Sequence, residues 1–137
     1  MKEYVLDSSA ILLYLRGTAD ASKVESLILD GEGRKAHLIM SAINWAECRH
    51  TLIRQRSAAS AQDLLSQIAK GVEIVVADRF HAELAADLKC RFKVSLADCF
   101  AASLAIVRKA ALVTSDPEFD ALKREIKIVH LDSRRGQ

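Results

Sequence analysis

Four acidic residues stand where a carboxylate could take part in chemistry. Asp7 ends a short apolar run near the amino terminus, Asp116 ends a similar run near the carboxyl terminus, and Asp98 opens an apolar helical segment. Glu47 borders the apolar stripe of another predicted helix, one turn inside it. Taken alone, each has an ordinary explanation, as a helix cap or as a solvent-facing side chain. That explanation is weakest for Asp98, because burying an isolated charge on a nearly all-apolar helix is costly.

Taken together, the four acids indicate one site. Ligands of parallel sheets bind beyond the carboxyl ends of the strands, which is where Asp7 and Asp116 are expected. Carboxylates that converge at neutral pH repel one another unless they bind a cation or share protons. Their oxygens suit Mg²⁺ and Mn²⁺, ions that polarise a phosphate and lower the pKa of bound water. The pattern favours metal-dependent phosphodiester hydrolysis by these acids, with Asp7, Asp98 and Asp116 as metal ligands.

Alternating strand and helix patterns predict the scaffold that would hold these acids. Short β-rich runs are expected at 3–7, 37–40, 73–77, 111–115 and 126–131. Helical patterns are expected at 9–16, 20–30, 42–56, 62–70, 79–93, 96–109 and 117–124. Such alternation forms βαβ units, so we expect an α/β fold with about five short strands in a mainly parallel sheet and about seven helices on both faces.

Residue types at the predicted helix ends sharpen these boundaries. Ser8 and Ser9 indicate a serine cap for the first helix, and Ser41 indicates a cap for the helix at 42–56,. Ser95 and Asp98 form an S-x-x-D capping pattern at the start of the helix at 96–109,. Capping is therefore a second role open to Asp98.

Composition bounds the class of protein. The 137 residues include 50% hydrophobic and 28% charged residues, which predicts one globular domain over 1–137,. No apolar run approaches the roughly 20 residues that span a bilayer, and no secretory signal is recognisable, so we expect a cytoplasmic protein without membrane association. A net charge of +2 does not identify a nucleic-acid binder, but local basic patches remain compatible with one,.

The segments that carry the four acids resemble those of the PIN-domain ribonucleases, specifically the VapC-type toxins of toxin–antitoxin pairs. VLDSSAILLYL, SAINWAE, LADCFAASLA and LVTSDPEF are similar to the four motifs of that family, and they carry Asp7, Glu47, Asp98 and Asp116 in that order. Ser8 follows the first acid, and Thr114 precedes the fourth in a T-x-D pattern. Ser8 and Thr114 are expected to hydrogen-bond a carboxylate or a metal-bound water.

The resemblance implies a three-layer α/β/α sandwich with strand order 3-2-1-4-5. It implies an endoribonuclease that depends on Mg²⁺ or Mn²⁺, a homodimer, and an antitoxin protein that blocks the site. Some relatives carry a further acid after the fourth motif. Glu118 and Asp120 are the candidates for that position here, although both are expected on the surface.

An inhibitor of such an acidic site is expected to bring Arg or Lys into the cleft. Its remaining contacts are expected to be apolar and to lie along the helices at 9–16 and 21–30 and the helix after Ser41. Those early helices carry more apolar side chains than a small core needs, among them Leu12, Leu13 and Leu15,.

Three basic groups could hold the phosphates of RNA if they flank the acids, although solvated faces explain most such runs. The first group consists of Arg49, Arg54 and Arg56, the second of Lys89, Arg91 and Lys93, and the third of Arg134 and Arg135.

Other functions fit less well. A phosphatase of the haloacid dehalogenase type would use Asp7 as a nucleophile and needs a second acid two residues later, where this chain has Ser9,. A receiver-like module needs an acid pair after the first strand, which is missing. A catalytically inactive PIN-like scaffold, or a module that only binds metal or a partner, stays open at this point.

Overall fold

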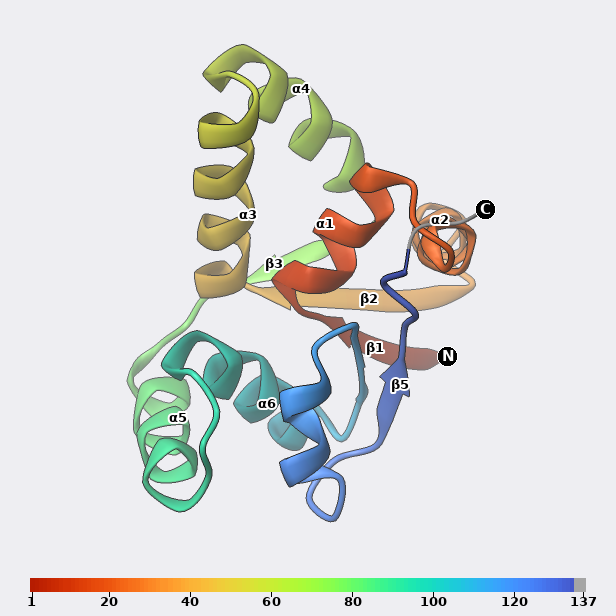
Figure 1. Ribbon diagram of the computed structural model, residues 1–137. Coiled ribbons are helices and arrows are strands. Elements are labelled where there is room, and N and C mark those ends of the chain that lie inside the picture. Colours follow the sequence, from red (N-terminus) through yellow and green to blue (C-terminus); the bar gives the residue numbers. More distant parts are fainter. Residues whose placement is uncertain (135–137) are drawn as a thin grey trace.

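The computed structural model describes residues 1–134, in which strands and helices alternate (Figure 1). The elements are β1 (Lys2–Leu6), α1 (Ser8–Arg16), α2 (Ala21–Glu32), β2 (Ala36–Ser41), α3 (Ala42–Gln55), α4 (Ala58–Ile68), β3 (Glu73–Val75), α5 (Arg79–Arg91), α6 (Leu96–Arg108), β4 (Ala111–Thr114), the 3₁₀-helix η1 (Pro117–Leu122) and β5 (Ile128–His130). The five strands and seven helices within residues 1–134 confirm the predicted α/β fold.

The sheet has the order β3-β2-β1-β4-β5, and every described strand pair is parallel. This confirms the order 3-2-1-4-5. Leu6, the last residue of β1, is in register with Val113 of β4, so the next residue of each strand lies at the same edge. The Asp7 N–H donates to the Val113 carbonyl at 3.3 Å. The register therefore brings Asp7 beside Thr114, at the carboxyl ends of the two central strands.

Helices cover both faces of the sheet, because successive strand residues point to opposite faces and both sets are apolar. Leu6 and Val113 pack with α1–α4 in one buried cluster, whereas Val5 and Leu112 pack with α5, α6 and η1 in the other. Figure 1 shows the same division, with α1–α4 above the sheet and α5, α6 and η1 below it. This is the predicted three-layer sandwich.

Helix α6 is the most deeply buried helix near the predicted site. Its buried residues include Cys99, Ala101, Ala102, Leu104 and Ala105. The small alanine side chains allow the helix to lie close to the sheet, and α6 is in contact with β1, β2 and β4. Ser95 caps its amino end by accepting a hydrogen bond from the Asp98 N–H at 3.2 Å, as the S-x-x-D pattern predicts. The first turn of α6 is therefore fixed.

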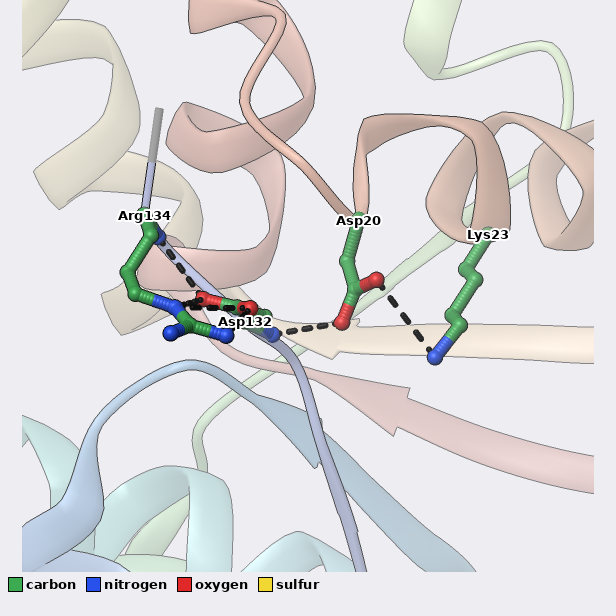
Figure 2. Close-up of polar contacts among 4 residues, drawn as sticks. All are labelled: Asp20, Lys23, Asp132 and Arg134. Atoms are coloured by element: carbon green, nitrogen blue, oxygen red, sulfur yellow. Dashed lines mark hydrogen bonds and ion pairs between the residues drawn. The ribbon is translucent and has the colours of Figure 1, made fainter. Parts of the chain in front are cut away.

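After β5 the chain turns to the loop between α1 and α2, where polar contacts anchor it (Figure 2). The Asp132 N–H donates to Oδ2 of Asp20, and the Ala19 N–H donates to the Arg134 carbonyl at 3.0 Å. The Arg134 guanidinium pairs with the Asp132 carboxylate at 2.8 Å, and Lys23 pairs with Asp20 at 3.4 Å. These contacts hold residues 132–134 beside the end of α1.

Several local predictions need correction. Asp7, not a serine, is the N-cap of α1. Helix α4 begins at Ala58 after a Ser57 cap, four residues before the predicted start, because the alanines and serine there carry no apolar periodicity. Strands β3 and β5 have three residues each and are shorter than predicted.

No helix in the described part of the chain has both the length and the hydropathy needed to cross a membrane.

Candidate active site

Asp7 is the most deeply buried of the four predicted acids, with 1% of its surface exposed. Its Oδ1 accepts hydrogen bonds from the Ser9 hydroxyl at 2.7 Å and from the Ala10 N–H at 3.0 Å. Its Oδ2 accepts a bond from Oγ1 of Thr114 at 2.6 Å. Burial raises the pKa of Asp7 to about 6, against the three hydrogen bonds, which stabilise its charged form,. The carboxylate is thus fixed in one orientation.

Thr114 joins the ends of the two central strands. Its side chain is fully buried, and Oγ1 accepts a hydrogen bond from the Asp116 N–H at 3.0 Å while donating to Asp7. The Ser9 hydroxyl lies 3.2 Å from Oγ1 of Thr114 and accepts a bond from the Ser115 N–H at 3.0 Å. The turn after β4, which carries Asp116, is therefore bound directly to the turn after β1.

Asp98, Asp116 and Glu118 form the tightest acidic group. One carboxylate oxygen of each lies within 4.8 Å of the others. The Asp116 carboxylate caps η1 by accepting the Glu118 N–H at 2.9 Å, which places Glu118 next to it. Acids from α6, from the turn after β4 and from η1 thus meet, and the Thr114 hydroxyl links this group to the buried Asp7.

The electrostatics of Asp98 link this group to Asp7. Burial raises the pKa of Asp98 to about 7, the Ser95 hydroxyl opposes the rise, and the carboxylates of Asp7 and Asp116 add to it. Like charges that lie this close cannot all ionise freely without a counter-ion. The arrangement therefore favours either a shared proton or a bound cation.

Glu47 lies at the rim of this acidic site. Its Oε1 accepts hydrogen bonds from the Ser8 hydroxyl and from Nδ2 of Asn44, both at 3.1 Å. Asn44 is fully buried and also donates from Nδ2 to the Ala97 carbonyl at 3.1 Å. The amide connects the first turn of α3 to the first turn of α6, next to Asp98.

The pKa of the Cys48 thiol is affected by the nearby carboxylates. Cys48 is buried beside Glu47, and its Sγ donates to the Ser8 carbonyl at 3.8 Å. Burial raises the pKa of this thiol, and the Asp7 and Glu47 carboxylates raise it further. Both carboxylates therefore lie near Cys48, which remains a protonated thiol and is unsuited to nucleophilic attack.

Of the four predicted acids, the structure brings Asp98 and Asp116 into one close group. Asp7 lies outside that group and is linked to Asp116 through the Thr114 hydroxyl. Glu47 is linked by a hydrogen bond to Ser8, the residue after Asp7. Of the two optional acids, Glu118 belongs to the group with Asp98 and Asp116, while Asp120 pairs on the surface with His130 at 3.2 Å.

The sequence reasoning missed Ser9 and Asn44. Ser9 lies two residues after a strand-end acid, a spacing at which a hydroxyl in the first helical turn reaches the cap. Asn44 lies three residues before Glu47, on the same helix face.

The three predicted RNA-binding arginines do not line the acidic group. Arg49 donates to Oε1 of Gln62 at 2.9 Å, and Arg54 lines a separate hollow with His50. Arg56 lines a cavity of about 750 Å³ that runs along α1 and also includes Ser8, Ser9 and Ser115. Arg56 thus shares a cavity with residues next to the acids. Arg135 of the third basic group lies outside the described residues.

Known structures share this fold. One is a DNA-bound VapBC complex from Salmonella typhimurium, with a TM-score of 0.76, 17% identity, and coverage of 95% of this chain and 98% of that chain. Another is VapBC2 from Rickettsia felis bound to a promoter DNA fragment, with a TM-score of 0.71, 19% identity, and coverage of 95% and 99%. A third is Mycobacterium tuberculosis VapC20, described as a Sarcin-Ricin loop cleaving toxin, with a TM-score of 0.67, 15% identity, and coverage of 86% and 93%.

No curated protein matches the sequence significantly. The sequence model of the PIN domain, in contrast, matches residues 4–125, a stretch that begins in β1 and ends after η1. This stretch contains every acid of the site described above. The chain therefore belongs to the PIN domain family.

Proposed function

We propose that the protein is a metal-dependent endoribonuclease that acts as the toxin of a type II toxin–antitoxin pair. The observation that carries the proposal is the convergence of Asp98, Asp116 and Glu118 within 4.8 Å, beside the buried Asp7. PIN domains generally use a divalent metal. The solved VapBC structure and the relative described as a Sarcin-Ricin loop cleaving toxin support the proposal that this PIN domain acts as a nuclease toxin.

The residues present fit a divalent cation. All the candidate ligands are carboxylate oxygens, which suit Mg²⁺ and also Mn²⁺. Asp7 accepts three hydrogen bonds, whereas a carboxylate offers about four lone-pair sites, so it retains capacity for an ion,. We assign Asp7, Asp98 and Asp116 as the ligands, and Glu118, whose carboxylate lies within 4.8 Å of those of Asp98 and Asp116, is a further candidate.

Such a cation, when bound, polarises the scissile phosphate and makes water more acidic. The chain's own residues orient the reactants around it. Thr114 and Ser9 hold the Asp7 carboxylate, and Ser95 fixes the turn that carries Asp98.

We assign Glu47 as the group that accepts the proton of the attacking water. Its Oε1 is engaged by Ser8 and Asn44, which leaves Oε2 as the oxygen able to take that proton,. The two hydrogen bonds also hold the side chain facing α1, on the side of Asp7.

The cavity along α1 supports the partner part of the proposal. Besides Ser8 and Ser9 it includes Leu12, Leu13, Leu15 and Arg16, so it joins apolar helix surface to the edge of the acidic site. An antitoxin segment with apolar residues and an Arg or Lys would fit this combination. We also propose a homodimer and, because the substrate is cellular RNA, a cytoplasmic site of action for the single domain 1–137.

The decisive assay combines the purified chain with bulk RNA in buffers that contain Mg²⁺, Mn²⁺ or EDTA. We expect cleavage with either ion, none with EDTA, and recovery when the ion is added back. Metal binding without any cleavage would instead indicate an inactive PIN scaffold. Cleavage that persists in EDTA would overturn the metal-dependent reaction.

A further inference from the structure

A second hollow, of about 600 Å³, adjoins the acidic group at the turn between α5 and α6. Its lining includes Lys89 and Arg91 from the last turn of α5 and Lys93 from the loop. Ser95, which caps the helix of Asp98, and Glu118, which belongs to the acidic group, complete it. The hollow is thus basic along the loop and reaches the acids at its other side.

Two of its three cations are available to a ligand. Arg91 pairs with Glu125 at 3.0 Å, and its guanidinium lies over the Phe92 ring at 4.9 Å from the centroid. Lys89 and Lys93 are exposed, and within residues 1–134 neither ammonium group takes part in an ion pair.

The acidic group creates a need for such cations. Asp7, Asp98, Asp116 and Glu118 carry four formal negative charges when ionised, and one divalent cation would leave two of them uncompensated. A polyanion is repelled by that excess, so its affinity must come from cations outside the ligand set. The two available lysines line the same hollow as Glu118, whereas the Arg49 and Arg54 side chains lie elsewhere.

We propose that Lys89 and Lys93 bind the phosphate backbone of single-stranded RNA next to the phosphate that is cleaved. Only the cleavage itself rests on the proposed nuclease function. Lysine binds phosphate as a point charge and reads no base. The Arg91 guanidinium already occupies one face of the Phe92 ring, a face that could otherwise stack on a base,. The contact is therefore independent of RNA sequence.

The test uses a double variant, Lys89→Gln with Lys93→Gln, and a control with the same change of charge, Lys35→Gln with Lys70→Gln. The control lysines are exposed and precede β2 and β3, so they lie toward the opposite edge of the sheet. Fluorescence anisotropy measures binding of a mixed-sequence single-stranded RNA at several salt concentrations, with EDTA present to prevent metal-dependent cleavage. Thermal melts check that every variant is folded.

We expect the double variant to bind RNA about 3- to 10-fold more weakly than wild type, while the control binds like wild type. The slope of log affinity against log salt should fall by about 1.4, because each phosphate contact on a single strand contributes about 0.7. In Mg²⁺, KM should rise and kcat should stay unchanged. If the double variant loses RNA binding but wild type cleaves no RNA, the lysine site is supported and the proposed nuclease function is refuted.

Three results would overturn the inference: equal weakening of both double variants, no weakening of either, or wild-type protein that binds no RNA. A fourth is lysine-dependent binding of polyglutamate at an affinity equal to that for RNA, which would assign the hollow to an acidic protein segment. If the double variant cleaves RNA with the same KM and kcat as wild type, the lysine site is refuted and the proposed nuclease function is supported.

Discussion

Oγ1 of Thr114 donates a hydrogen bond of 2.6 Å to Oδ2 of Asp7, across 107 positions of sequence. Both side chains are buried, and the same Oγ1 accepts the N–H of Asp116 at 3.0 Å. One hydroxyl thus fixes the orientation of one acid and the turn that carries another. This relationship depends on the parallel register of β1 and β4, which places the ends of the two strands side by side.

Thr114→Val should therefore damage the site more than a surface change would. It keeps the shape of the side chain but leaves Oδ2 of Asp7 and the N–H of Asp116 without their partner. We expect a loss of about 1–3 kcal/mol in the free energy of unfolding and a 10- to 100-fold weaker affinity for the metal. Urea unfolding and metal titration measure the two effects. Thr114→Ser, which keeps the hydroxyl, is the control, and equal behaviour of the two variants would refute this role.

The pKa shifts predict how stability depends on pH without metal. An unfolded aspartate titrates near 3.8, whereas folded Asp98 titrates at about 7 and folded Asp7 at about 6. The folded state therefore holds these protons more tightly, and stability decreases as pH rises from about 4 to about 7. Melting temperatures in EDTA should be lower at pH 8 than at pH 5, and Mg²⁺ should restore them at pH 8.

Asp98→Asn provides the matched comparison for this pH dependence, because it removes one of the clustered charges and its titration. Its melting temperature in EDTA should change less between pH 5 and pH 8, and at pH 8 it should exceed that of wild type. A pH profile identical to that of wild type would show that carboxylate repulsion does not govern the stability of the site.

Asn44 should act on the reaction through Glu47. Asn44→Ala removes the bond to Oε1 of Glu47 and leaves the Ala97 carbonyl without its side-chain donor. We expect kcat for RNA cleavage to fall about 10-fold, while Mn²⁺ affinity stays close to that of wild type, since Glu47 is not assigned as a ligand. Ser8→Ala, which removes the other bond to the same oxygen, should lower kcat in the same direction. Loss of metal affinity with unchanged kcat would contradict this assignment.

Gly31 should be irreplaceable for packing reasons. A Cβ at this position would clash with the backbone oxygen of Gly71, where α2 meets the turn before β3. We expect Gly31→Ala to cost about 1–3 kcal/mol or more, measured by urea unfolding. Gly33→Ala is the matched control, because its Cβ would meet its nearest atom at 3.4 Å. Similar destabilisation of both variants would contradict the steric explanation.

The parallel α/β sheet and the positions of the acids at the ends of its elements could be predicted from residue patterns, whereas the strand order came only from the family resemblance. Each acid marks the end of an apolar strand or the start of a helix, and parallel strands bring those points to one edge. The finer contacts could not. Whether Ser8 or Ser9 reaches Asp7 depends on the rotation of the first turn of α1, which sequence spacing does not specify. The same holds for Glu118 and Asp120, because the 3₁₀ geometry of η1 decides which of them faces Asp98.

The arginines show a further limit of periodicity. Arg49, Arg54 and Arg56 follow Glu47 on a predicted helix and were expected to hold RNA phosphates if they flank the acids. In the structure Arg49 binds Gln62 of α4, a helix whose start the sequence pattern placed four residues too late. The partner helix determines where each arginine points, and its position is a tertiary property.

The central claim is that Asp7, Asp98 and Asp116 form one divalent-metal site, and Mn²⁺ binding tests it most directly. Electron paramagnetic resonance of free Mn²⁺ should be recorded at pH 7.5 for wild type, Asp98→Asn and Asp120→Asn, the last being an exposed acid paired with His130. We predict Mn²⁺ binding by wild type and Asp120→Asn and at least 10-fold weaker binding by Asp98→Asn, with RNA cleavage lost in that variant alone. Unchanged Mn²⁺ affinity in folded Asp98→Asn would contradict the claim.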